Sequence, residues 1–82
     1  MAVLRLTGLL AQEVGARRLT VEAATLGDAL RALPATGLVL DEHGDLRPLV
    51  HAYVDGAREL DLGATLAPAA EVILIAAVAG GM

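Results

Sequence analysis

The chain of 82 residues contains neither cysteine nor lysine, and each absence excludes a class of chemistry. Without cysteine there is no disulfide, no thiolate nucleophile and no cysteine-based metal site. Without lysine, no isopeptide bond can form on a side chain of this protein. Any covalent chemistry of the chain must therefore use other groups.

Aromatic side chains are almost absent as well, with one tyrosine and neither phenylalanine nor tryptophan. Apolar residues make up 56% of the chain and charged residues 20%, which is too apolar for a disordered acidic chain. A domain of this length buries roughly 60–65% of its unfolded surface. The sequence therefore predicts a single domain with a modest core of leucine, valine and alanine.

The chain also lacks a basic stripe and long apolar runs. Its net charge is −4, and the six basic residues are all arginines, scattered except for the pair Arg17-Arg18. This distribution argues against nucleic-acid binding as the main task. No apolar run approaches the ~18 residues of a membrane-spanning helix, and none follows a basic N-terminus. We therefore expect no membrane partner, no signal peptide and a cytoplasmic location.

Two segments near the N-terminus alternate between apolar and polar residues, as strands with one buried face do. These are residues 3–6 and residues 18–22. The segment between them contains Gly8 and Gly15 and predicts a loop with a short helical turn. The two strands are therefore expected to be neighbours joined by more than a tight turn.

A helix is predicted after Thr25, which occupies an N-cap position with Asp28 three residues later, a partial capping box. Pro34 should end this helix near Leu33 because the residue before a proline disfavours helical backbone angles. The side chains at helical spacing form one apolar face, consisting of Leu26, Ala29, Leu30 and Leu33.

Residues 35–48 follow no clear period, and Leu38 and Leu40 are candidate core residues within them. Residues 41–45 predict a solvated turn. Three side chains of this turn could ligate a hard metal, but acidic turns are usually only solvated, so we expect no metal site. They are Asp41, His43 and Asp45.

The second half of the chain predicts three more strands. Residues 49–54 form the first, and Asp55-Gly56 is a dipeptide typical of two-residue hairpin turns. Residues 58–60 form a short return strand. The last strand, residues 71–76, is rich in β-branched residues and is expected at the centre of the sheet.

This order of elements predicts an α+β fold, with one main helix on one face of a mixed sheet of four to five strands. If the first and last strands pair in parallel at the centre, the fold is the ubiquitin-like β-grasp. We expect residues 1–76 to form this domain and residues 77–82, which include Gly80-Gly81, to form a flexible C-terminal tail.

Nearly the whole chain resembles the MoaD/ThiS group of ubiquitin-like sulfur carriers, in particular the molybdopterin synthase small subunits. The most specific likeness is Gly80-Gly81 shortly after an aliphatic strand. Two features depart from the family pattern: Ala76-Ala77 replaces frequent prolines, and Met82 follows the second glycine. The likeness also includes residues 3–6, the loop with Leu9 and Glu13, the helix after Thr25, the hairpin Tyr53-Val54-Asp55-Gly56 and residues 71–78.

The resemblance implies that the protein is a carrier and not itself an enzyme. An adenylyltransferase of the ubiquitin-activating type would use ATP and Mg to adenylate Gly81, and sulfur would displace AMP to leave a thiocarboxylate. No cofactor would be bound by the chain. The sulfur acceptor in the molybdopterin branch is a pterin precursor held by a larger subunit.

The small residues of the tail suit this chemistry because a narrow channel can admit them. Gly80 and Ala79 would give Gly81 access, and an extended segment of six residues would reach roughly 20 Å at ~3.3 Å per residue. Met82 blocks the carboxyl of Gly81 as the chain is written. Three explanations of Met82 stay open. A peptidase, such as a JAMM-type metalloprotease, removes it, or it has no functional meaning, or the domain is never activated.

A partner-docking face is expected on the side of the sheet away from the helix. If Val72 and Leu74 face the helix, then Tyr53, Ile73 and Ile75 lie on the open side, and an exposed apolar patch usually marks a partner site. We assign Tyr53, Ile73, Ile75 and Val78 to docking. A register slip of one residue would reverse the two faces. His51 is interpreted as a surface or interface histidine.

Three functions and four pathways stay open at this stage. The chain could be a sulfur carrier, a protein modifier whose Gly81 is joined to target lysines, or an interaction subunit that is never activated. As a carrier it could deliver sulfur for molybdopterin, thiamine, cysteine or tRNA thiolation. The length of the chain favours the molybdopterin branch.

Overall fold

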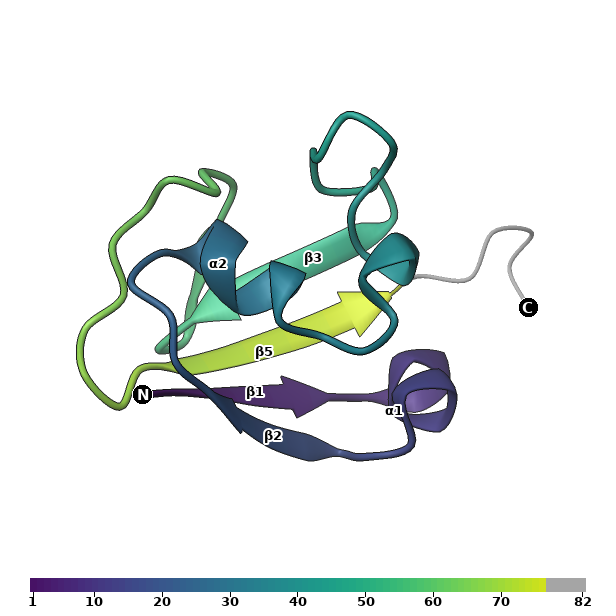
Figure 1. Cartoon of the computed structure of the whole chain (residues 1–82), viewed down its shortest axis with the longest axis horizontal. Coiled ribbons are helices and arrows are strands. Elements are labelled where there is room, and N and C mark those ends of the chain that lie inside the picture. The colour runs from purple at the N-terminus through teal and green to yellow at the C-terminus, as the bar shows by residue number, and fades with distance from the viewer. Residues whose placement is uncertain (77–82) are drawn as a thin grey trace.

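A computed structural model of the chain describes residues 1–76 (Figure 1). These residues form one five-stranded sheet, two α-helices and a short 3₁₀ helix. No helix within them is long and apolar enough to cross a membrane. In chain order the elements are β1 (Ala2–Leu6), α1 (Gly8–Val14), β2 (Arg18–Val21), α2 (Leu26–Arg31), η1 (Thr36–Leu38), β3 (Val50–Val54), β4 (Ala57–Glu59) and β5 (Glu71–Ala76).

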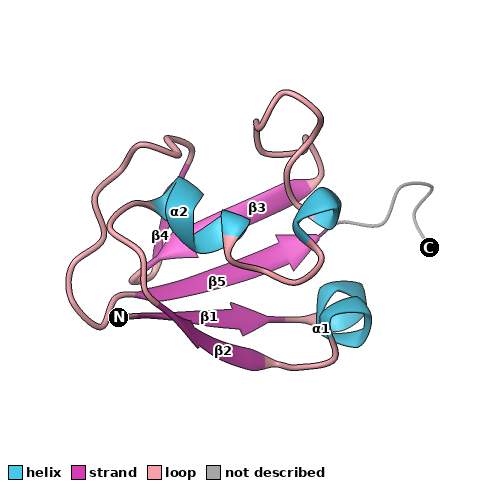
Figure 2. Cartoon of the chain, in the orientation of Figure 1, coloured by secondary structure: helices cyan, strands magenta, loops and turns pink. Residues whose placement is uncertain are grey.

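The sheet has the strand order β2-β1-β5-β3-β4, so the last strand lies at its centre. β5 runs parallel to β1 and antiparallel to β3, and the two edge strands are antiparallel to their neighbours. α2 lies over one face of this sheet (Figure 2). The structure confirms the predicted α+β class, the mixed sheet and the parallel central pair of a β-grasp fold.

The core is the single aliphatic cluster that the composition requires. It fills the space between α2 and the inner face of the sheet, and Leu30, Val72 and Leu74 are fully buried within it. All four residues of the predicted helical face are buried: Leu26, Ala29, Leu30 and Leu33.

The N-cap of α2 forms as predicted, because the backbone N–H of Asp28 donates to Thr25 Oγ1 over 3.2 Å. The helix ends at Arg31, two residues before the predicted end. The N–H of Leu33 bonds to the carbonyl of Leu30, a tightened turn that no longer continues the α-helix. Thr36 Oγ1 then donates to the Leu33 carbonyl over 2.7 Å and satisfies this end of the helix.

Two sequence predictions need correction. Within the segment 7–15, residues Gly8–Val14 form the seven-residue helix α1 rather than a loop with a short turn, and Gly15 ends it in a left-handed conformation with φ 84°. Of the two candidate core residues in the irregular segment, Leu40 is buried but Leu38 is 40% exposed. The 3₁₀ helix η1 changes the local period, so the adjacent Val39 takes the core position instead.

The hairpin between β3 and β4 is the two-residue turn that Asp55-Gly56 predicts. Both residues have positive φ, 49° and 89°, as a type I′ turn requires. Asp55 also binds the start of β5, because its carboxylate accepts from the N–H of Glu71 over 2.9 Å and its own N–H donates to the Glu71 carbonyl. The return strand β4 begins at Ala57, one residue earlier than expected.

Candidate functional site

The open face of the sheet carries the apolar residues that the sequence placed there. Val72 and Leu74 of β5 are fully buried beneath α2. Ile73 and Ile75 alternate with them along the strand and point to the opposite side. Tyr53 lies directly opposite Ile73, and His51 directly opposite Ile75. The predicted register is therefore confirmed, and a slip of one residue is excluded.

This apolar strip is accessible from solution within the described residues. Ile75 is 41% exposed, while Ile73 and Tyr53 are half-buried. Paired aromatic and β-branched side chains also stabilise the strands that carry them, by roughly 0.2–1 kcal/mol. His51 lies beside the strip with a buried Nδ1 that has no hydrogen-bond partner among the described residues. The docking role of Tyr53, Ile73 and Ile75 stays a prediction.

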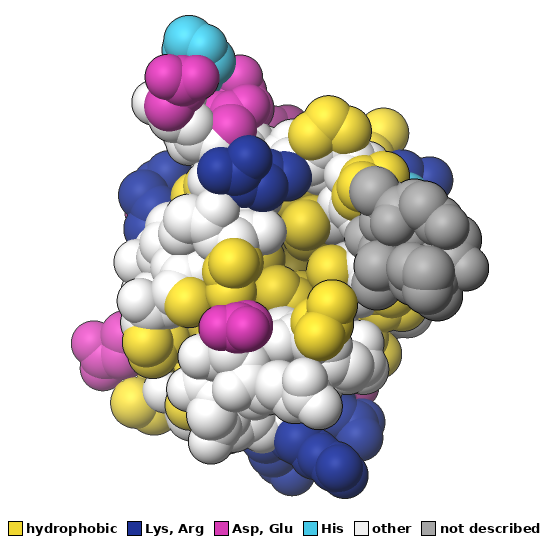
Figure 3. All heavy atoms as spheres, turned by 90° about the vertical axis from the view of Figure 1, so that its right-hand side faces the viewer, with side chains coloured by type: hydrophobic (Ala, Val, Ile, Leu, Met, Phe, Trp, Pro, Cys, Tyr) yellow, Lys and Arg dark blue, Asp and Glu magenta, His cyan; other side chains and the backbone are white. Residues whose placement is uncertain are grey.

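A second exposed apolar region surrounds the end of β5. Leu9, Leu38 and Leu49 are between 40% and 52% exposed. Leu38 and Leu49 line a hollow of about 310 Å³ together with Ala76, and hydrophobic side chains gather around a hollow at this end of the molecule (Figure 3). The alternation of residues 49–54 predicts that Leu49 faces outward, in the same register as Tyr53, whereas the exposure of Leu38 was not predicted. The exposure of Leu9 follows from the short helix α1, in which the adjacent Leu10 takes the buried position.

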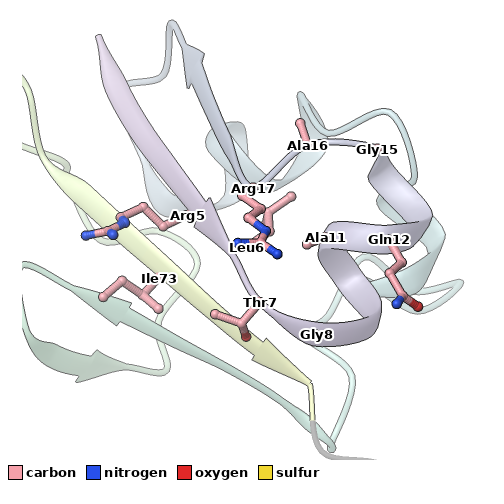
Figure 4. A pocket seen from close by; sticks show the side chains of 10 residues that line it. All are labelled: Arg5, Leu6, Thr7, Gly8, Ala11, Gln12, Gly15, Ala16, Arg17 and Ile73. Carbon is pink, nitrogen blue, oxygen red and sulfur yellow. The ribbon is translucent and has the colours of Figure 1, made fainter.

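A concavity lies where β1, α1 and the start of β2 meet (Figure 4). Its volume is about 980 Å³. Arg5, Arg17, Thr7 and Gln12 supply its polar lining, Ile73 connects it to the apolar strip, and no lining residue is a carboxylate. No pattern in the sequence indicates this cavity, because its walls come together only after the strands pair.

In the acidic turn at residues 41–45, the carboxylate of Asp41 stabilises the turn itself. Asp41 Oδ1 accepts from the N–H of His43 over 2.8 Å and from that of Asp45 over 3.0 Å. The hydrogen bond from Asp45 is the largest cause that lowers the pKa of Asp41 below its ordinary value. Within residues 1–76 no group of three or more acidic or histidine side chains is placed to hold a metal ion.

The sites predicted in the tail lie outside the described residues. They are the attachment residue Gly81, the access residues Gly80 and Ala79, and the docking residue Val78, and all four stay predictions. β5 ends at Ala76, so four residues of sequence separate the end of the central strand from Gly81. The predicted division into residues 1–76 and 77–82 also stays a prediction.

No protein-family model and no curated protein sequence matches the chain. Among solved structures it is similar to SAMP1, small archaeal modifier protein 1, from Haloferax volcanii. The two chains are 31% identical, the match covers 98% of each, and the TM-score is 0.80. An identity at this level over the full length of both chains indicates common descent.

Two further solved structures share the fold at lower identity. Mycobacterium tuberculosis CysO, described as an antigen, is 18% identical, with 95% of this chain and 100% of the other covered and a TM-score of 0.79. The BexX/CysO complex of Amycolatopsis orientalis is also 18% identical, with 99% and 100% covered and a TM-score of 0.78. At this identity the likeness supports the architecture alone.

Proposed function

The chain belongs to the ubiquitin-like sulfur carriers of the MoaD/ThiS type, and on that premise we propose that Gly81 is activated by a partner enzyme and carries sulfur. One observation carries the proposal. A chain matched over its full length to SAMP1 has Gly80-Gly81 four residues beyond the end of its central strand. The chain itself acts as a carrier and not as an enzyme.

The proposed reaction begins at the carboxylate of Gly81. A partner adenylyltransferase of the ubiquitin-activating type, using ATP and Mg, joins this carboxylate to AMP and releases pyrophosphate. Sulfide then attacks the carbonyl carbon, the bond to AMP breaks, and a thiocarboxylate remains. Glycine suits this step because no side chain hinders the close approach of the carbonyl to the α-phosphate.

The carboxylate of Gly81 must be free for this reaction, so we include the removal of Met82 by a peptidase in the proposal. Mass spectrometry of the protein isolated from its own cells tests this step. The expected mass is that of a chain ending at Gly81. An intact Met82 in every molecule would eliminate the trimming step.

The open face supplies the docking part of the proposal. Tyr53 lies on β3, and Ile73 and Ile75 lie on the paired strand β5. In the sequence, β5 is followed directly by the tail. A partner held on this face would therefore lie next to the strand that delivers Gly81. Correct positioning of reacting groups supplies several kcal/mol of barrier reduction.

For the recipient we propose, from the resemblance and the length of the chain, a pterin precursor held by a larger subunit of the molybdopterin synthase type in the cytoplasm. Reconstitution tests this assignment. The thiocarboxylate form, mixed with that subunit and the precursor, should yield dithiolene product. Sulfur transfer only to another acceptor would redirect the protein to a different pathway.

The central test is activation in vitro. The chain ending at Gly81 is incubated with the adenylyltransferase, ATP and sulfide, and its mass is measured. We expect the gain that corresponds to the replacement of one oxygen by sulfur, together with ATP–pyrophosphate exchange. A chain ending at Gly80 is the matched control. Absence of exchange with the chain that ends at Gly81 would leave only an interaction subunit without tail chemistry.

A second function, protein modification, is favoured by the description of the Haloferax volcanii relative as a modifier. The same adenylate would then be attacked by the ε-amino group of a lysine on another protein, releasing AMP. Incubation with activating enzyme, ATP and cell extract distinguishes the two. Adducts of higher mass that depend on Gly81 indicate modification, whereas a thiocarboxylate without adducts indicates sulfur transfer.

A further inference from the structure

One row of side chains crosses all five strands of the open face. Arg18 pairs with Arg5 across β2 and β1, Arg5 with Ile73 across β1 and β5, Ile73 with Tyr53, and Tyr53 with Arg58. Direct partners point to the same side of a sheet. The row therefore places two apolar side chains at the centre and arginines at both ends, across roughly 19 Å at ~4.8 Å per strand.

The charge of this face is opposite to that of the molecule. Its strand residues include three arginines and one carboxylate, Glu71, which pairs with Arg5 over 3.3 Å. Their side chains therefore total +2, whereas the whole chain carries −4 and the remainder carries −6. Arg18 and Arg58 are exposed, and within residues 1–76 neither forms an ion pair.

The cavity beside this row contains a further cation, Arg17, which forms no ion pair within residues 1–76. Arg5 and Arg17 both line it, Thr7 and Gln12 add polar groups, and its lining contains no carboxylate. Figure 4 shows Arg17 at the centre of the lining and Arg5 toward the strand that carries Ile73. A carboxylate entering this cavity would meet guanidinium groups, which bind carboxylates in a bidentate geometry.

The two arginines at one end of the row do not stabilise the free protein. Like charges directly opposite each other on neighbouring strands destabilise a sheet, and Arg5 and Arg18 are such a pair. We infer that the open face docks a protein surface whose apolar centre is flanked by carboxylates, one of which enters the cavity between Arg5 and Arg17. The apolar centre of Ile73 and Tyr53 favours a protein over a nucleic acid. The inference rests on the proposed function, which supplies an adenylyltransferase as the partner.

The test uses charge reversals of equal size on opposite sides of the molecule. Arg18→Glu and Arg58→Glu change the open face, and Arg31→Glu is the matched control on α2, where Arg31 bonds to Asp28. Each variant changes the net charge by the same amount. Thermal unfolding verifies that each is folded, and Arg18→Glu should be at least as stable as the parent because it removes a like-charge pair.

Association with the adenylyltransferase of the same organism is measured by stopped flow with the full chain. We expect the rate constant to fall about tenfold for Arg18→Glu and for Arg58→Glu at low salt, but to change little for Arg31→Glu. The difference should vanish near 1 M salt, where the screening length is about 3 Å. Equal effects of all three variants, or no complex with the parent chain, would overturn the inference.

The outcomes separate this inference from the proposed function. If the complex shows the expected arginine dependence but the chain ending at Gly81 supports no ATP–pyrophosphate exchange, the proposed function fails and the inference stands. If exchange occurs but the arginine variants match the control, the inference fails alone. Arginine-dependent binding to a DNA duplex without arginine-dependent binding to the adenylyltransferase would overturn it in favour of a nucleic-acid partner.

Discussion

The two faces of β5 carry the same kind of side chain and have opposite surroundings. Val72 and Leu74 are fully buried, whereas the alternating Ile73 and Ile75 face the open side, and Ile75 is 41% exposed. α2 covers the first pair, and no described helix covers the second (Figure 2). Hydrophobicity alone therefore does not decide burial in this strand, and a covering element does. The uncovered pair marks the face available to a partner.

The largest effect is expected from the covered face. Leu74→Ala should lower the free energy of unfolding by about 2–5 kcal/mol, because it removes buried methyl groups and leaves a cavity at the centre of the core. Chemical denaturation measures the change. The matched variant Ile75→Ala should cost less than about 1 kcal/mol, since solvent already reaches this side chain.

Equal losses of stability for Leu74→Ala and Ile75→Ala would contradict the difference between the two faces. They would mean that the open face is covered by something within the free chain. A change in the denaturant dependence as well as in the midpoint would point instead to an effect on the unfolded state.

The second effect concerns binding rather than folding. Ile75→Asp should leave the fold intact but weaken association with the activating partner by about 1–2 kcal/mol, roughly five- to thirtyfold, because a charge would enter the apolar strip. Titration calorimetry measures the affinity, and circular dichroism verifies the fold. Tyr53→Asp should act in the same way. Unfolding of either variant would place that residue in the core.

A smaller effect is expected at the N-cap on the covered side. Thr25→Ala should cost about 1 kcal/mol of stability, because the N–H of Asp28 loses its acceptor. Thr25→Ser keeps the hydroxyl and is the matched control. Binding to the proposed activating partner should be the same for both variants, since α2 lies on the face away from the apolar strip. A binding defect specific to Thr25→Ala would indicate that the covered side also contacts a partner.

The smallest effect is a loss of stability in acid. Arg31 and then Thr25 bond to Asp28 and lower its pKa, and Asp45 and His43 do the same for Asp41. A carboxyl whose pKa is lower in the folded state contributes stability above its unfolded pKa, and this contribution is lost as the pH falls through the folded value. Asp28 is exposed and Asp41 is half-buried near the surface, and interactions of such groups are weakened by solvent, so the effect is small.

Thermal unfolding between neutral pH and pH ~2 measures this loss, since unperturbed aspartates titrate near 3.9. The double variant Asp28→Asn, Asp41→Asn should show a shallower decline on the acid side than the parent. An identical pH profile for the double variant would exclude both carboxyls as contributors.

Local patterns in the sequence predicted much of the fold correctly. The alternation in β5, the cap at Thr25 and the turn at Asp55-Gly56 depend on residues close in sequence, and each formed as expected. α1 was missed because Thr7 makes no side-chain cap and a glycine begins the helix. Leu38 was misassigned because a 3₁₀ helix shifts the period.

The tail chemistry was predicted from the sequence and the resemblance alone, and it depends on residues outside the described part. The open strip was predicted from the alternation of residues 71–76 and is now placed by cross-strand pairing. The cavity at Arg5 and Arg17 and the exposure of Leu9 and Leu38 were not predicted.

By itself, the sequence determined which side chains of each strand share a face, because successive residues of a strand point to opposite sides and a single turn sets the local register. The Asp55-Gly56 turn already sets Arg58 opposite Tyr53, but only the tertiary structure decided that Arg18, Arg5 and Ile73 would line up with this pair across five strands. That alignment depends on hydrogen bonds between segments far apart in the chain, and no local pattern specifies their register.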